Sequence, residues 1–232
     1  MNERARCTLK VWGEFACFSR PEFKTERVTY PVMTPSAARG VLEAIFWKPE
    51  IRWEVQDIAV LRPIKTTSLL RNEVKSKQNI GNAPFVIEEQ RQQRTSLVLK
   101  DVEYVLSADL VTQVHSKDPI IKYRNQFEER VSRGQFHHSP FLGTREFAAA
   151  FEAPTGMETA IPENLDIGPM LFDLAFVPDQ MRRELSWMKG TGPDRAPVPG
   201  FAEAIFFDAK LDSGHLKIPQ TLYERKAALE AA

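Results

Sequence analysis

A cluster of basic, hydroxyl and imidazole side chains lies between residues 115 and 145. Lysine and arginine can place positive charge beside a phosphate, and histidine and tyrosine can exchange protons, so the set suits phosphate chemistry without a metal ion. A structural alternative stays open, since paired histidines also occupy solvated turns and a tyrosine can belong to the core. The members are His115, Lys122, Tyr123, Arg124, Arg130, Arg133, His137 and His138.

Groups of these types are sufficient to cleave RNA. The 2′-hydroxyl of RNA attacks the adjacent phosphate, so a protein needs only to orient that hydroxyl, transfer protons and neutralise the charge that develops on the phosphorane. Lysine, tyrosine and histidine can perform these tasks. The cluster therefore favours phosphodiester chemistry, although composition alone leaves the function open.

Motifs of several other enzyme classes are absent from the sequence. The chain has no phosphate-binding glycine loop, no HExxH or GxSxG motif and no carboxylate array suited to two metal ions. Its two cysteines, Cys7 and Cys17, lack zinc-ligand spacing and indicate small buried thiols. The absence of these motifs argues against redox, kinase and protease functions. We expect neither a metal site nor a cofactor.

Charge is segregated along a chain whose formal net charge is zero. Residues 62–100 contain eight Lys or Arg against three Asp or Glu (+5), whereas residues 146–232 contain eight against fourteen (−6). This distribution is typical of an RNA-facing half and a partner-facing half, but also of a neutral protein with unevenly solvated faces. Both explanations stay open at this point.

Composition indicates a globular protein, with 43% hydrophobic and 27% charged residues. No apolar run approaches the roughly 20 residues that a bilayer requires, and the first residues do not resemble a signal peptide. We therefore expect no membrane association and a cytoplasmic location.

Hydrophobic periodicity predicts an α+β fold with a ferredoxin-like first domain. Thr34 and Pro35 provide the N-cap and first position of a helix at residues 35–47, and a second helix ends near Gly134. Together with the strands, these helices give the β-α-β-β-α-β order of ferredoxin-like, RRM-like domains. The predicted strands of this domain, which we place at residues 1–153, lie at residues 6–18, 51–65, 96–114 and 145–151.

The remaining residues, 154–232, predict a small antiparallel β-sheet domain. Its strands are expected at residues 168–177, 202–210 and 215–218, separated by segments rich in proline and glycine.

A polar, basic insertion interrupts the first domain at about residues 66–95. It contains Arg71, Arg91 and Arg94 together with turn-forming residues, and its pattern predicts a long loop. Long loops in compact domains are uncommon unless they are functional or disordered. The insertion is therefore either a ligand-binding element or a mobile solvated loop.

The segment at residues 32–49, VMTPSAARGVLEAIFWKP, resembles the first-helix signature of the subtype I-C (Dvulg) CRISPR-associated RAMP family. Further matches follow in family order over roughly residues 6–218. They are LRPI at residues 61–64, RNEV at 71–74, RQQR at 91–94, GQ at 134–135 and PFLGTREF at 140–147.

This resemblance implies a RAMP-type ferredoxin-like domain followed by a C-terminal sheet. It also implies metal-independent cleavage of precursor CRISPR RNA at the repeat and retention of the 5′ handle within a type I-C interference complex. The implied partners are CRISPR repeat RNA and the backbone and large subunits of that complex, with DNA as a further candidate.

By position, the resemblance assigns catalysis to Lys122, Tyr123 and Phe46. Phe46 and Tyr123 depart from the commonest family pattern, and Phe46 cannot exchange a proton, so its role reduces to stacking or shaping the pocket. A non-catalytic RNA-binding and assembly subunit therefore remains the alternative. The RNA-binding residues that we predict are Arg39, Lys48, Arg71, Arg91, Arg94, Arg124, Arg130, Arg133, His137 and His138.

Overall fold

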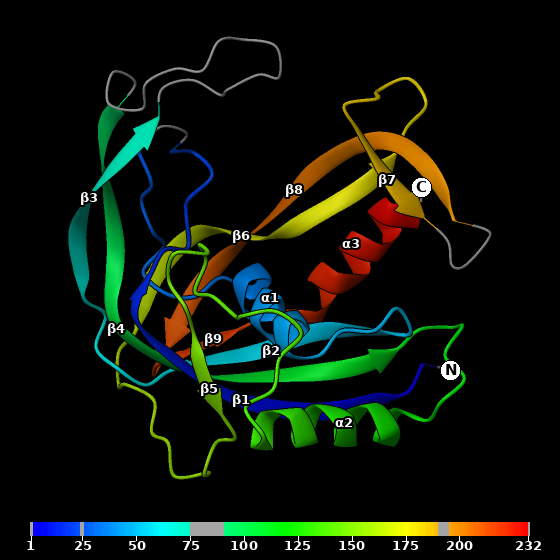
Figure 1. Ribbon diagram of the computed structural model, residues 1–232, viewed down its shortest axis with the longest axis horizontal. Coiled ribbons are helices and arrows are strands. Elements are labelled where there is room, and N and C mark those ends of the chain that lie inside the picture. Colours follow the sequence, from blue (N-terminus) through cyan, green and yellow to red (C-terminus); the bar gives the residue numbers. More distant parts are fainter. Residues whose placement is uncertain (1, 24–25, 75–90, 190–194, 232) are drawn as a thin grey trace.

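The computed structural model describes residues 2–23, 26–74, 91–189 and 195–231. In these residues the fold is α+β, with a mostly antiparallel sheet whose main path runs β5-β1-β4-β2-β9-β8-β6 (Figure 1). β3 pairs with β4 and β7 pairs with β8 beside this path. The strands are β1 Arg4–Ala16, β2 Ile51–Val60, β3 Thr66–Val74, β4 Arg91–Thr112, β5 Ala150–Glu152, β6 Leu165–Pro178, β7 Leu185–Lys189, β8 Ala196–Asp212 and β9 His215–Lys217.

The helices are α1 Pro35–Ile45, α2 Ile120–Ser132 and α3 Gln220–Ala231. α1 begins as its sequence predicts, because Thr34 accepts a hydrogen bond from the Ala37 amide and Pro35 occupies the first turn. Its buried positions form one stripe that joins the hydrophobic core. The chain leaves the helix at Phe46, whose backbone is extended.

α1 and α2 meet at Trp53 of β2. The indole N–H of Trp53 donates to the Phe46 carbonyl over 2.9 Å, and its ring contacts Phe127 of α2 at 4.9 Å between centroids. α2 buries Tyr123, Phe127 and Val131, the spacing that predicted it, and Gly134 follows in the left-handed region at φ +63°. Trp53 therefore links the C-terminal end of α1 to the middle of α2.

The predicted loop at residues 66–95 is wrong for its described parts. Thr66–Val74 and the first residues of β4 form an antiparallel hairpin in which Arg71 pairs with Arg94 in register (Figure 1). One face of β3 is exposed and the other is only half-buried, so no buried apolar face signals a strand. The centre of the predicted insertion, residues 75–90, lies outside the described residues.

The predicted strand at residues 145–151 is shorter in the structure, where β5 spans Ala150–Glu152. The preceding residues form a loop that returns to the end of β1. Gly143 allows this approach, because a Cβ there would lie 2.0 Å from the Cys17 carbonyl oxygen and its φ is +85°.

The C-terminal part contains the predicted antiparallel strands within β6, β8 and β9, and also β7 and α3, which the sequence did not predict. α3 escaped prediction because Leu222 is its one buried residue. The sheet and the hydrophobic core continue across residues 153 and 154, since β9 pairs with β2. The division into two domains stays a prediction. None of the helices in the described ranges has the length and apolarity needed to cross a bilayer.

Candidate nucleic-acid interface

The C-terminal end of α1 is the centre of the candidate site. Phe46, which the resemblance assigns to catalysis, is 1% exposed. Its amide donates to the Leu42 carbonyl and its carbonyl accepts from Trp53. Phe46 is thus a fixed part of the core edge, with its ring face available to neighbouring side chains.

Arg130 connects α2 to this end of α1. Its guanidinium donates to the Ile45 carbonyl over 2.8 Å and lies 5.4 Å from the centroid of the Phe46 ring. The first contact satisfies a carbonyl that the end of the helix leaves without an intrahelical partner. The second is a cation–π contact. Arg130 is therefore both a structural link and a positive charge at the site.

Lys48 lies over two aromatic rings. Its ammonium is 5.9 Å from the centroid of the Phe46 ring and 5.5 Å from that of the Tyr123 ring. Both distances are within the range of cation–π attraction. The side chain is half-buried, so its charged end is held at the boundary between core and solvent.

The two adjacent residues predicted to be catalytic on α2 have opposite environments. Tyr123 is 2% exposed, and its hydroxyl shares a hydrogen bond with the Ser116 hydroxyl over 3.2 Å. Lys122 is exposed and donates to the Asp118 carboxylate over 2.8 Å. That hydrogen bond raises the pKa of Lys122. Tyr123 therefore presents a ring to the site, and Lys122 presents a charge that Asp118 already compensates.

The loop after α2 brings two histidines to the same place. The amides of His137 and His138 donate to the Ala44 carbonyl over 2.8 and 3.2 Å, and both imidazoles are exposed, with centroids 5.9 Å apart. Nε2 of His115 lies 2.9 Å from the Pro49 carbonyl oxygen, close in sequence to Lys48. We define the α1-end cluster as Phe46, Lys48, Tyr123, Arg130, His137 and His138.

Other predicted RNA-binding residues lie outside this cluster. Arg124 and Arg133 belong to α2 or its end, but each pairs with a glutamate one turn away, Glu128 or Glu129. Arg39 lies on another face of α1, where its guanidinium is bound to Asp173 of β6.

The hairpin arginines form a separate group. Arg71 contacts Glu73 at 2.7 Å and Glu146 at 3.2 Å, and Arg94 contacts Glu73 at 3.2 Å. Arg91 is exposed at the start of β4. The structure therefore separates the predicted RNA-binding residues into the α1-end cluster, the α2 surface, the hairpin and the paired Arg39.

Sequence reasoning missed three side chains that organise the site, namely Trp53, Ser116 and Asp118. Asp118 could have been found, because it precedes Lys122 by one helical turn, a spacing typical of ion pairs. Trp53 and Ser116 act through contacts with Phe46 and Tyr123, which no local pattern indicates.

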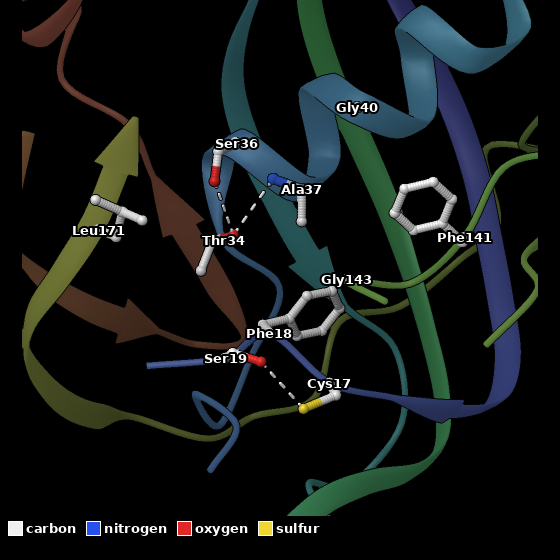
Figure 2. Close-up of a pocket in the computed structure, with 10 residues that line it drawn as sticks. All are labelled: Cys17, Phe18, Ser19, Thr34, Ser36, Ala37, Gly40, Phe141, Gly143 and Leu171. Atoms are coloured by element: carbon white, nitrogen blue, oxygen red, sulfur yellow. Dashed lines mark hydrogen bonds between the residues drawn. The ribbon is translucent and has the colours of Figure 1, made fainter. Parts of the chain in front are cut away.

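The opposite end of α1 borders a different recess. A groove of about 350 Å³ lies between the start of α1, the end of β1 and the loop at residues 141–143. Figure 2 shows Thr34 bonded to Ser36 and Ala37 at its edge, with Phe18 and Leu171 among the apolar lining side chains. None of the predicted catalytic residues lines this groove.

The α1-end cluster can bind a phosphate and neutralise charge on it. Lys48 and Arg130 supply positive charge beside ring faces, and the exposed imidazoles can accept or donate a proton. This is the combination that phosphodiester cleavage requires of a protein.

The family model Cas_Cas5d, which is described as CRISPR-associated protein (Cas_Cas5), matches residues 8–191. The CRISPR pre-crRNA endoribonuclease Cas5d of Thermus thermophilus is 56% identical over 226 residues, covering 97% of this chain and 96% of the relative. The protein of the same name from Mannheimia succiniciproducens is 40% identical over 192 residues, covering 74% of this chain and 85% of the relative.

Solved structures share the fold. A crystal structure of a CRISPR-associated protein has a TM-score of 0.63 at 19% identity and covers 94% of each chain. A functionally uncharacterized protein from Streptococcus mutans has a TM-score of 0.62 at 18% identity, covering 94% of this chain and 95% of that one. The sequence match extends over most of the chain, and the chain therefore belongs to the Cas5d family of CRISPR-associated proteins.

Proposed function

We propose that this protein is an RNA-binding endoribonuclease that cleaves precursor CRISPR RNA. The observation that carries the proposal is the 56% identity, over 97% of this chain, to a protein named as such an enzyme. The α1-end cluster supports it independently, because it combines positive charge, ring faces and exposed imidazoles at one place.

Cleavage proceeds by attack of the RNA 2′-hydroxyl on the adjacent phosphate and requires no metal ion. The bond from phosphorus to the 5′ oxygen breaks, leaving a 2′,3′-cyclic phosphate on one product and a 5′-hydroxyl on the other. The protein contributes orientation, charge neutralisation and proton transfer, for which the side chains of the cluster are suited.

The wider assignment follows the family. Strands β5-β1-β4-β2 with α1 and α2 constitute the ferredoxin-like domain at residues 1–153, a proposal that the strand order supports. The protein retains the 5′ handle in a cytoplasmic type I-C interference complex with its backbone and large subunits, and its acidic C-terminal half faces protein partners. DNA is a further candidate ligand.

Among the three residues that the resemblance assigns to catalysis, the buried Phe46 and Tyr123 act through their rings, whereas the exposed Lys122 contacts RNA. The second candidate function is a non-catalytic RNA-binding and assembly subunit. Two observations favour that alternative, since Phe46 has no hydroxyl and the Tyr123 hydroxyl is buried against Ser116.

Incubation of the purified protein with its cognate repeat RNA in a chelator distinguishes the two functions. We expect one cut per repeat, a 2′,3′-cyclic phosphate product, and no cut when the nucleotide before the scissile bond is 2′-deoxy. Intact RNA at stoichiometric protein, with tight binding preserved, would instead establish the assembly subunit.

A further inference from the structure

We propose that Lys48 is a catalytic residue, whose ammonium contacts the scissile phosphate and neutralises the charge that develops there during cleavage. The inference rests on the proposed ribonuclease function and deepens it. It transfers the electrostatic role from Lys122, on which the family pattern places it, to a residue that the family pattern does not assign.

Lys48 and Lys122 differ in whether a carboxylate compensates their charge. Within the described part of the chain, no carboxylate lies within ion-pair distance of Lys48 or Arg130, whereas Lys122 is paired with Asp118 at 2.8 Å. Arg124 of α2 and Arg133 at its end are likewise paired, with Glu128 and Glu129. A phosphate that approaches Lys122 must compete with a carboxylate already bound, and a phosphate that approaches Lys48 meets an uncompensated charge. Lys48 and Arg130 thus carry the uncompensated positive charge of the α1-end cluster, and Arg130 already donates to the Ile45 carbonyl.

The Lys48 side chain is also held in position before any substrate binds. A lysine side chain normally samples many rotamers, and fixing it for catalysis costs entropy. Here two ring faces hold the ammonium, with centroids 5.9 Å and 5.5 Å away on Phe46 and Tyr123. Phe46 is itself fixed by Trp53, and Tyr123 by Ser116. A charge positioned before the substrate binds stabilises a transition state without reorganisation during the reaction.

The same contacts explain what the altered family positions do. Phe46 and Tyr123 cannot bring a proton-exchanging group to RNA, because one lacks such a group and the other buries it. Both rings instead support Lys48, and Arg130 holds the opposite helix against the Ile45 carbonyl beside the Phe46 ring. Phe46, Tyr123 and Arg130 are thus positioning residues.

The chemical step balances with these groups. The 2′ oxygen forms a bond to phosphorus and gives its proton to water or to a neutral imidazole of His137 or His138. The bond from phosphorus to the 5′ oxygen breaks, and that oxygen takes a proton from water or from the resulting imidazolium. Lys48 keeps its protons throughout and donates a hydrogen bond to a non-bridging oxygen, so protons and charge are conserved.

The test compares Lys48→Ala and Lys48→Arg with wild type and with Lys210→Ala, a matched control at an exposed lysine of β8. Single-turnover cleavage of repeat RNA, RNA affinity and melting temperature are measured for each full-length protein. We expect Lys48→Ala to cleave on the order of a hundredfold more slowly, with affinity changed less than threefold. Lys48→Arg keeps the charge and should recover part of the rate, and Lys210→Ala should match wild type.

Each other outcome has a definite meaning. If wild type cleaves and Lys48→Ala cleaves within twofold of it, the inference is wrong and the proposed function stands. If affinity and rate fall equally, Lys48 is an ordinary phosphate contact and the catalytic assignment is wrong. If wild type does not cleave, the proposed function itself fails. A rate loss that Lys48→Arg shares fully, with a lowered melting temperature, would reassign Lys48 to structure.

Discussion

Two regions that touch α1 use basic residues in opposite ways. At the end of the helix, Lys48 and Arg130 lie over rings and have no carboxylate partner within the described residues. On another face, Arg39 and Lys226 both bind Asp173, which is 6% exposed and also accepts a hydrogen bond from the Leu174 amide. In the first region the positive charge is available to a ligand. In the second region Asp173 already compensates it.

The second region, which we call the Asp173 network, joins side chains from three elements. Arg39 comes from α1, Asp173 from β6 and Lys226 from α3. The network adds polar contacts to the apolar attachment of α3, in which Leu222 is buried and Tyr223 packs against Phe172 of β6 with ring centroids 4.8 Å apart. The comparison shows that basic residues close to one helix differ in whether a carboxylate already compensates their charge, which the number of arginines and lysines does not reveal.

The largest expected effect is on stability, from Asp173→Ala. The change leaves Arg39 and Lys226 without their shared partner, and breaking a buried pair from one side costs about 3 kcal/mol. Urea denaturation should show a correspondingly lower midpoint. Asp166→Ala, at an exposed carboxylate of the same strand 4.0 Å from Lys210, should cost no more than about 0.5 kcal/mol. Equal costs for the two variants would mean that the network is not structural.

A smaller effect is expected from changes at Tyr123 that separate its hydroxyl from its ring. Tyr123→Phe removes the hydrogen bond to Ser116 and should cost about 1 kcal/mol of unfolding free energy. Tyr123→Leu removes the ring on which Lys48 lies, and should slow cleavage more than Tyr123→Phe does. If Tyr123→Phe slowed single-turnover cleavage as much as Tyr123→Leu, the hydroxyl rather than the ring would carry the function.

Acid should weaken the fold through Glu54, a buried carboxylate of β2 that pairs with Arg4 and Arg52. Burial raises the pKa of Glu54, but hydrogen bonds from Gln220 and Arg52 and the charges of Arg52 and Arg4 outweigh it, so the pKa lies below its usual value. A lowered pKa stabilises the fold above the unfolded value of about 4.3, and this contribution disappears as pH falls through the folded pKa.

Denaturation midpoints measured between about pH 6 and pH 3 test this effect. Glu54→Gln should be less stable than wild type at pH 6, and its stability should fall less steeply toward low pH. An unchanged slope would show that Glu54 is not the titrating group.

The smallest expected effect concerns the hairpin. Arg91→Glu should weaken RNA binding and reduce the slope of log affinity against log salt by about 1, since one phosphate contact is lost. Filter binding at several salt concentrations measures both quantities. An affinity that is unchanged at low and high salt would mean that Arg91 does not face RNA.

The parts of the fold that depend on neighbours in sequence were predictable, and the long-range parts were not. Thr34 and Pro35 mark the start of α1 by local capping, and Tyr123, Phe127 and Val131 mark α2 by spacing. The hairpin was not predicted, because β3 and the first residues of β4, which hold Arg71 and Arg94, have no buried apolar face.

The same distinction holds for the site. The sequence predicted site residues that the structure places near the end of α1 and the start of α2, among them Lys48, Phe46 and Tyr123, and their role stays a prediction. It could not show which charges are compensated, because Arg39 and Asp173 lie 134 positions apart. Nor could it show that the Tyr123 hydroxyl faces Ser116 while its ring faces Lys48, since both contacts depend on how α2 packs against the sheet.

The most direct measurement is a structure of the protein bound to repeat RNA that carries a 2′-deoxynucleotide before the scissile bond. This RNA cannot be cleaved but preserves the phosphate. We predict a non-bridging oxygen of that phosphate at about 3 Å from the Lys48 ammonium. The Phe46 and Tyr123 rings should lie beneath the lysine, and Lys122 should still be paired with Asp118. A scissile phosphate held by Lys122, or bound away from the α1-end cluster, would contradict this prediction.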